Sequence, residues 1–252
     1  MGKHIRRVEP PTRRQASLGI EILGIIGELL ITAAIVIGLF AVWQLYWTTF
    51  KVDGPRQEQI TAFEEKYSPS TKKVGERRTD EPPPIPPTTP GEIYGIIHVP
   101  SWDWSRTPLA EGIAQYTLDL GYAGHYDQTA QPGVLGNFSV AGHRRSHGNN
   151  FRWIDRLKQG DKVVVEVADT YYVYSVDNHE IYAASDETNI KVIAPVPGDL
   201  TFSQQPSEKW MTMTSCHPEW GNSERYIVHL KFESWTPKST GMPEELVKAP
   251  YA

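Results

Sequence analysis

The chain has 252 residues, of which 39% are hydrophobic and 22% charged, and its formal net charge is −5. This length and composition suit one or two folded domains. A nucleic-acid partner is not expected, because such proteins carry clustered basic residues. The single cysteine excludes an internal disulfide. No group of histidine, cysteine and aspartate has the spacing of metal ligands, so we expect neither a metal nor another cofactor.

Residues 18–47 are almost entirely apolar, and no charge interrupts the run from Leu29 to Trp43. A helix of this length crosses a membrane core about 30 Å thick. A secretory signal peptide is the alternative, but its apolar run would be shorter and would end at a small-residue cleavage site. Here the run ends in Trp43, Tyr46 and Trp47, which suit a membrane interface. We therefore expect an uncleaved transmembrane anchor over residues 18–47, in contact with membrane lipid.

Basic residues are concentrated before the apolar segment. Residues 1–17 contain five of them, whereas only Lys51 and Arg56 follow the segment closely. The positive-inside rule then makes residues 1–17 a cytoplasmic basic tail and places the bulk of the chain outside the cell membrane. Residues 1–47 hold five basic and three acidic residues, so 20 basic and 27 acidic residues remain outside, a net charge of −7. In an exported protein, an odd cysteine is a reactive thiol, an intermolecular partner or an inert buried residue.

Residues 48–90 have the composition of a stalk. Gly54-Pro55 is expected to break the anchor helix, and the proline-rich run over residues 81–90 favours extended polyproline II. Such a segment predicts a semi-rigid spacer between the membrane and a folded domain.

From residue 91 onward, short β-rich stretches alternate with turns. Residues 150–157 have helix-like spacing of their apolar side chains. About eight short strands favour a closed, mostly antiparallel β-barrel or a sandwich. We expect this domain over residues 91–236, followed by a polar tail over residues 237–252. The candidate strands are residues 95–100, 109–113, 136–143, 162–167, 171–176, 186–193, 209–215 and 225–232.

Cys216 ends one predicted strand and Arg225 begins the next, so a thiol and a guanidinium can meet at one rim of a sheet. A cysteine nucleophile needs a base, an acid for the leaving group and donors for the oxyanion. The permanently charged guanidinium can supply such donors. From spacing alone, a surface salt bridge with Glu219 or Glu224 is the simpler explanation of Arg225.

His143 stands out among the eight histidines because it follows a glycine at the end of a strand, where its imidazole can project over a cleft. His125 is the other loop candidate. His229 is also not excluded as the base, because strand alternation places it on the same face as Arg225. His147 is interpreted as a solvated loop residue.

These stretches resemble the sortases, membrane-anchored cysteine transpeptidases of Gram-positive bacteria. Residues 212–216, Thr-Met-Thr-Ser-Cys, are similar to the family motif Thr-Leu-X-Thr-Cys, with methionine for leucine and serine for threonine. Residues 136–144, Gly-Asn-Phe-Ser-Val-Ala-Gly-His-Arg, resemble the family's histidine stretch. Arg225 opens the following strand, as the family arginine does. The resemblance covers about residues 92–235.

The resemblance implies a mostly β fold, namely a closed eight-stranded sortase-type barrel with short helices after the transmembrane helix and the Pro-rich stalk. Cys216 would cleave a Leu-(Ala/Pro)-X-Thr-Gly sorting signal between Thr and Gly through a thioacyl intermediate. His143 would act as general acid and base, and Arg225 would hold the oxyanion or the substrate. The implied partners are secreted proteins with a C-terminal sorting signal and the amine of a lipid II-like peptidoglycan precursor.

Four further residues are candidates for substrate binding under this resemblance. Tyr126 is expected either to line the pocket or to pack in the core. Ser215 is a candidate donor near the oxyanion, although its missing methyl group leaves that role open. Thr214 lies within the same motif, His217 directly follows it, and these two residues complete the set.

Cys216-His217-Pro218 and the Gly-His-Tyr stretch that ends at Tyr126 resemble class E sortases, the housekeeping enzymes of actinobacteria. Pilin-polymerising class C enzymes usually carry a second membrane span and an N-terminal lid, and neither pattern is evident. A class C-like pilin polymerase and a non-catalytic extracytoplasmic binding module are the alternatives.

Overall fold

The computed structural model of the chain describes residues 18–251, so the tail expected over residues 1–17 lies outside the described residues. The chain divides into two compact units, Met1–Gln44 and Leu45–Ala252. In the described part of the first unit, α1 (Leu18–Lys66) presents exposed apolar side chains from Ile20 onward. The helix is long and apolar enough to cross a membrane, as expected.

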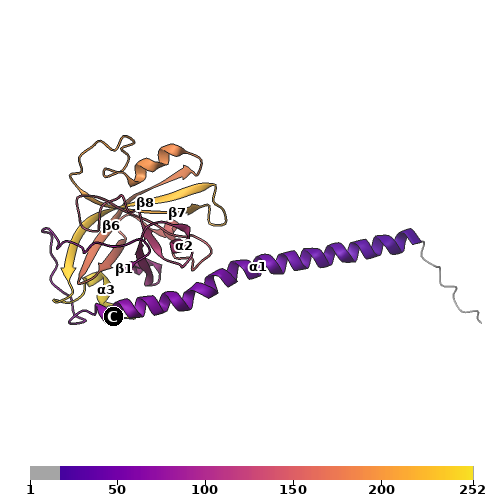
Figure 1. Cartoon of the computed structure of the whole chain (residues 1–252), viewed down its shortest axis with the longest axis horizontal. Coiled ribbons are helices and arrows are strands. Elements are labelled where there is room, and N and C mark those ends of the chain that lie inside the picture. The colour runs from indigo at the N-terminus through magenta and orange to yellow at the C-terminus, as the bar shows by residue number, and fades with distance from the viewer. Residues whose placement is uncertain (1–17, 252) are drawn as a thin grey trace, which may run out of the picture. The chain divides into compact units, whose positions relative to one another are not determined.

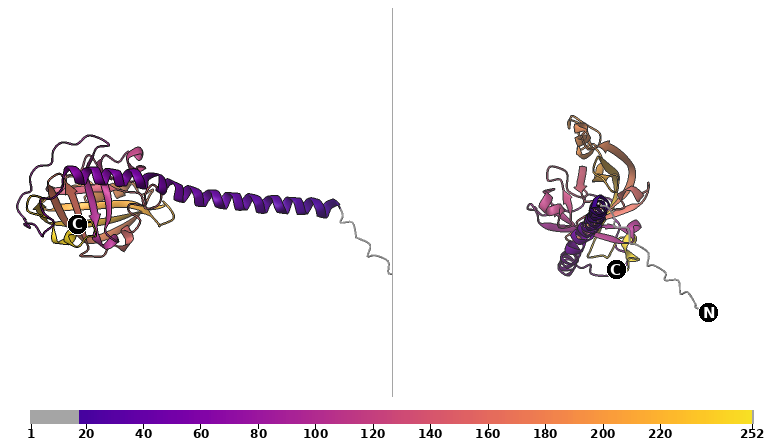
Figure 2. Two further views of the ribbon diagram at one scale, coloured as in Figure 1. Left: turned by 90° about the horizontal axis from the view of Figure 1, so that it is seen from below. Right: turned by 90° about the vertical axis from the view of Figure 1, so that its right-hand side faces the viewer.

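The expected break at Gly54-Pro55 is wrong, because α1 contains both residues and continues to Lys66. Proline removes one backbone hydrogen bond from a helix, and such a cost is tolerated where packing stabilises the next turns. Here Ile60 and Phe63 are buried against Ile96 of the barrel. The left-hand view of Figure 2 shows this part of α1 lying across the strands.

The second unit is built around a closed eight-stranded barrel, which confirms the expected fold (Figure 1). The strand order is β1-β2-β3-β4-β7-β8-β6-β5. The β2–β3 and β4–β7 pairs are parallel and the other six are antiparallel. The strands are β1 (Ile93–Val99), β2 (Ser105–Glu111), β3 (Ala123–His125), β4 (Gly136–Ala141), β5 (Lys162–Val167), β6 (Thr170–Ala183), β7 (Lys209–His217) and β8 (Glu224–Pro237).

Alternating residues of these strands fill the barrel. Val163 and Val165 of β5, Phe138 of β4 and Met211 and Met213 of β7 are all buried in one core cluster. Side chains two residues apart share a face of a strand, and β-branched residues pack well on that pleated surface. The β-rich stretches between turns in the sequence therefore predict these strands correctly.

Short helices fill the connections. The predicted strand over residues 186–193 is wrong, because this segment forms the 3₁₀ helix η3 (Glu187–Ile193). The Asp186 carboxylate accepts a hydrogen bond from the Thr188 backbone N–H, and such capping favours a helix start over an extended chain. The other short helices are η1 (Pro100–Trp102), α2 (Gln115–Leu118), η2 (Ile154–Arg156) and α3 (Glu244–Val247).

Parts of the expected semi-rigid spacer and of the expected polar tail pack on the barrel. Arg78 pairs with the backbone of Trp235, whose indole N–H donates to the Asp80 carbonyl at 3.0 Å. In the tail, Met242 and Leu246 are buried on the outer face of β5 and β6. The compact unit therefore begins well before residue 91 and includes residues beyond 236. The outward-facing apolar residues of β5 and β6 explain why the tail packs there.

Candidate active site

One pocket of about 300 Å³ is lined by six of the seven residues proposed from the sequence. The seventh, His217, is not among its lining residues. The rest of the lining is largely apolar, which is typical of ligand sites with a few convergent polar groups. The six residues are Tyr126, His143, Thr214, Ser215, Cys216 and Arg225.

Cys216 and Arg225 face each other across the β7–β8 ladder, where they form a register pair. Directly opposed residues in an antiparallel pair have Cβ atoms about 4.5–5.5 Å apart. The thiol is free and half-buried. Arg225 Nη1 donates to the backbone carbonyls of Asn222 and Glu224, each at 2.9 Å. Within residues 18–251, no carboxylate forms an ion pair with Arg225, so its charge remains available to the pocket.

His143 reaches the pocket because the end of β4 is held against β7. The Gly142 N–H donates to the Thr214 carbonyl at 3.1 Å, and the Ser215 hydroxyl donates to the Gly142 carbonyl at 2.7 Å. Gly142 also packs closely on Phe151, because a Cβ at this position would lie 2.8 Å from the aromatic ring. Ser215 therefore holds the backbone next to His143, and its hydroxyl proton is directed to Gly142.

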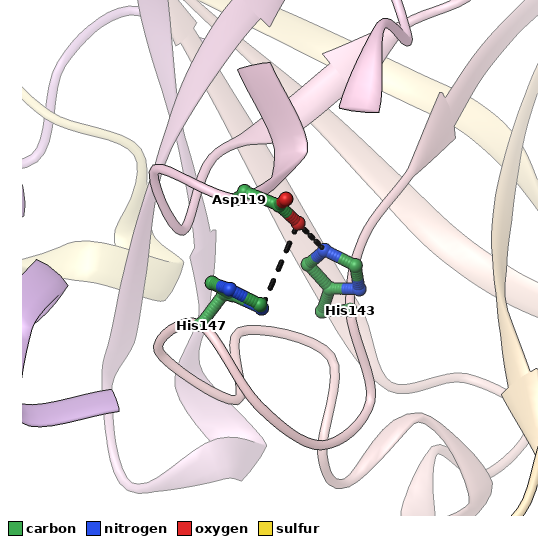
Figure 3. A group of neighbouring side chains, drawn as sticks. All are labelled: Asp119, His143 and His147. Atoms are coloured by element: carbon green, nitrogen blue, oxygen red, sulfur yellow. Dashed lines mark hydrogen bonds and ion pairs between the residues drawn. The ribbon is translucent and has the colours of Figure 1, made fainter. Parts of the chain in front are cut away.

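Asp119 and His147 surround the His143 ring, as Figure 3 shows. His143 Nε2 lies 2.7 Å from Asp119 Oδ1, and His147 Nδ1 lies 3.6 Å from the same oxygen. Burial lowers the pKa of His147; the Asp119 charge opposes this shift and the His143 charge adds to it. His147 lies in a loop, as expected, and its side chain is 30% exposed because one side of it faces this cluster. Asp119 was not indicated by the sequence because it lies 24 residues before His143.

Tyr126 both lines the pocket and packs against η3, so its two expected roles coincide. Its hydroxyl lies 3.1 Å from Thr214 Oγ1, and Thr214 in turn donates to the Val140 carbonyl at 3.3 Å. Burial raises the pKa of Tyr126, while the bond to Thr214 and the charge of Arg225 lower it. Tyr126 is thus a neutral phenol that donates to Thr214.

His217 has a different environment from the other predicted residues. Its Nδ1 lies 2.5 Å from Nη1 of the buried Arg144, whose Nη2 forms an ion pair with Asp155 at 2.6 Å. Because a guanidinium only donates, Nδ1 of His217 must accept and carries no proton. Arg144 Nη1 also reaches the Cys216 carbonyl at 3.5 Å. Arg144 and His217 thereby support the backbone behind the thiol.

The loop that follows His143 is held by α1. Arg56 Nη1 donates to the Gly148 carbonyl at 3.0 Å. Three non-glycine residues of this loop have positive φ angles, 74° at Ser146, 44° at His147 and 50° at Asn149. Such conformations persist only where the surroundings determine them. The part of α1 around Arg56 therefore helps to fix the loop that carries His147.

The geometry agrees with comparisons to known proteins. A family model described as the sortase domain matches residues 97–233, more than half of the chain. The chain belongs to the sortase family. Sortase SrtE1 of Streptomyces coelicolor is 33% identical over 228 residues, which are 88% of this chain and 60% of that relative. Sortase SrtE2 of the same organism is 31% identical over 224 residues, 86% of this chain and 84% of the relative.

Solved sortase structures share the barrel. The SrtA sortase from Actinomyces oris has a TM-score of 0.62 and 42% identity, covering 68% of this chain and 96% of that one. Sortase E1 from Streptomyces coelicolor, solved with a tripeptide in the active site, has a TM-score of 0.56 and 36% identity, covering 64% and 99%. These relatives confirm the expected likeness to class E. This sortase spans about 60% of the length of SrtE1.

Proposed function

We propose that this sortase is a cysteine transpeptidase in which Cys216 is the nucleophile, His143 the general acid and base, and Arg225 the oxyanion donor. The observation that carries the proposal is a pocket lined by a free thiol, an imidazole and a guanidinium. Within residues 18–251, no carboxylate forms an ion pair with this guanidinium, that of Arg225. A binding module has no need for this combination, whereas acyl transfer uses each group.

The reaction follows from what each group can donate. The Cys216 thiolate attacks the Thr–Gly carbonyl carbon of a sorting signal, and the oxyanion that forms accepts hydrogen bonds from Arg225. His143 gives a proton to the leaving glycine amine, the C–N bond breaks, and a thioester remains. An incoming amine then attacks the thioester while His143 takes its proton, and the thiolate leaves as the new amide forms.

Asp119 assigns the two nitrogen atoms of His143 to different tasks. Nε2 lies 2.7 Å from the carboxylate, so Nε2–H donates to Asp119 in both the neutral and the charged ring. The proton that is exchanged with the substrate is therefore the one on Nδ1. Asp119 is a positioning residue, because it acts on the reaction only through the His143 ring.

The apolar part of the pocket suits the aliphatic residues of a Leu-(Ala/Pro)-X-Thr-Gly signal. Ile113 and Ile190 are both exposed at its lining and offer contact for a leucine side chain. We infer that the acceptor is the amine of a lipid II-like cell-wall precursor and that α1 anchors the enzyme with its N-terminus in the cytoplasm. The resemblance to class E supports a housekeeping role on secreted proteins.

Peptide cleavage tests the proposal. The full chain in detergent micelles is incubated with Leu-Ala-X-Thr-Gly and Leu-Pro-X-Thr-Gly peptides and an amine, and the cleaved and ligated products are separated by mass. Cys216→Ala, His143→Ala and Arg225→Ala should each abolish product. His217→Ala should still form product, because His217 lies outside the pocket and Arg144 itself reaches the Cys216 carbonyl. Wild-type turnover by Cys216→Ala, or a dead His217→Ala with an active His143→Ala, would refute the assignment. Covalent polymers from isolated pilin subunits would favour the class C-like alternative.

A further inference from the structure

Three metal-ligating groups converge beside the catalytic pocket. Ligand atoms of Asp119, His143 and His147 all lie within 4.8 Å of one another. Figure 3 shows the carboxylate pointing between the two imidazoles. All three side chains are half-buried, so an ion from solvent can reach them. Of these three residues, the proposed reaction uses only His143 and its positioning carboxylate, Asp119, which leaves His147 without a role in catalysis.

The spacing of the ligand atoms fits one small cation. Zn²⁺ binds imidazole nitrogen and carboxylate oxygen at about 2.0–2.2 Å in a tetrahedron, which places neighbouring ligand atoms about 3.3 Å apart. The distances from Asp119 Oδ1 are 2.7 Å to His143 Nε2 and 3.6 Å to His147 Nδ1, which bracket that value, and all three ligand atoms lie within 4.8 Å of one another. His147 Nδ1 also lies 3.0 Å from the Ser146 hydroxyl, and it exchanges this hydrogen bond for the metal when the ion binds. Ca²⁺ and Mg²⁺ prefer oxygen ligands alone, so the two imidazoles favour zinc.

The position of His147 is fixed by its backbone and by a neighbouring helix. His147 has a φ angle of 44°, and the glycine that follows it accepts the hydrogen bond from Arg56 of α1. The loop thus returns His147 toward His143, with ring centroids 5.2 Å apart. A preformed arrangement of this kind lowers the cost of ordering the ligands when an ion binds.

We propose that Asp119, His143 and His147 form a zinc site whose occupation inhibits the transpeptidase. Zn²⁺ takes the place of the proton on His143 Nε2, and that proton is released to solvent. The metal-bound ring is then neutral and gives up its remaining Nδ1 proton only with difficulty, so it can no longer protonate the leaving amine. Inhibition rests on the proposed role of His143, whereas zinc binding itself does not.

Binding is measured without relying on activity. The full chain carrying Cys216→Ala, which removes the competing thiolate, is titrated with Zn²⁺ by calorimetry and with Co²⁺ by visible absorption. One equivalent should bind, and Co²⁺ should show the intense bands of a tetrahedral site. A further His147→Ala change should weaken Zn²⁺ binding by about tenfold or more, because loss of even an outer-shell partner costs 10–100-fold. His179→Ala, which changes an exposed histidine outside the cluster, is the matched control. Equal zinc affinity with and without His147 overturns the site.

Activity then tests inhibition with Cys216 intact. Zn²⁺ should stop peptide cleavage by the wild-type enzyme, and a chelator should restore it. His147→Ala should keep the basal rate and need at least about ten times more Zn²⁺ for the same inhibition. Inhibition of this variant at the wild-type zinc concentration, or full activity of a zinc-loaded wild type, contradicts the proposal. Cleavage by His143→Ala would instead overturn the proposed function and leave the binding result standing.

Discussion

Replacing Asp119 tests how much the orientation of the His143 ring contributes to the reaction rate, because the ring itself is left unchanged. The Asp119 carboxylate accepts from Nε2 at 2.7 Å, and both side chains are about a quarter to a third exposed. A hydrogen bond to a charged group contributes about 1.5–3 kcal/mol net, and partial exposure reduces this to about 1–2 kcal/mol. If that energy holds the ring in its reactive orientation, Asp119→Ala should lower kcat about 5- to 30-fold.

The asparagine variant refines the same prediction. An asparagine side chain would still offer a carbonyl oxygen to Nε2–H but without the charge, so Asp119→Asn should lower kcat by less than Asp119→Ala. KM should change little in either variant, because Asp119 acts on the ring and not on the signal peptide. Initial rates over a range of peptide concentrations, measured on the full chain in micelles, separate the two constants.

A matched control guards against a general effect of lost charge. Asp127→Asn removes an exposed carboxylate that is not a lining residue of the pocket and should leave kcat unchanged. Unfolding temperatures of all the variants show whether the fold is kept. Asp119→Ala with wild-type kcat, or with its whole effect in KM, refutes the assignment of Asp119 as a positioning residue.

Two contacts outside the pocket, Arg56 with Gly148 and Glu166 with Lys238, lead to further predictions. Arg56→Ala removes the bond to the Gly148 carbonyl and should lower amide protection in the loop that follows His143, as measured by hydrogen exchange; unchanged protection would contradict a role for Arg56 in holding this loop. Burial alone raises the pKa of Glu166, but His98 and Lys238 hold it below its usual range, so the buried carboxylate is charged. Glu166→Gln leaves Lys238 buried without a counter-charge and should cost about 3–5 kcal/mol. The midpoint of thermal unfolding should then fall by on the order of 10 °C, and an unchanged midpoint would contradict the reasoning.

The sequence predicts the barrel well where local pattern and tertiary packing agree. In β5, Val163 and Val165 belong to the central core and Val164 to the outer cluster, so β-branched content between turns identifies this strand. The segment over residues 186–193 has similar β-branched content, but the side chain of Asp186 caps a 3₁₀ helix there. Gly54-Pro55 has the composition of a helix end, yet the contacts of Ile60 and Phe63 with the barrel hold the helix together. Such contacts between distant segments cannot be derived from local composition.

The residues of the site also fall into those that the sequence indicates and those that only the fold reveals. Cys216, His143 and Arg225 each stand at a strand end with a recognisable neighbourhood, and the structure collects them in one pocket. Asp119 follows the short helix α2 and has no motif around it, so only the fold shows that it reaches His143. His147 differs from an ordinary loop histidine only through the backbone turn that brings it back, which its neighbours in sequence do not reveal.

Ser215, the residue before Cys216, shows how a departure from the family pattern fits the fold. Its hydroxyl donates to the Gly142 carbonyl, and this bond joins the residue before Cys216 to the residue before His143. A threonine hydroxyl can make the same hydrogen bond. Serine in place of threonine therefore keeps the bond to the Gly142 carbonyl and loses only the packing of one methyl group. Ser215→Ala should therefore impair catalysis by loosening His143, while Ser215→Thr should restore it; equal rates for Ser215→Ala and the wild-type enzyme in the peptide assay would contradict this. A direct oxyanion role for the Ser215 hydroxyl would require its proton to leave the Gly142 carbonyl, so the hydroxyl at this position links β7 to the chain that follows β4.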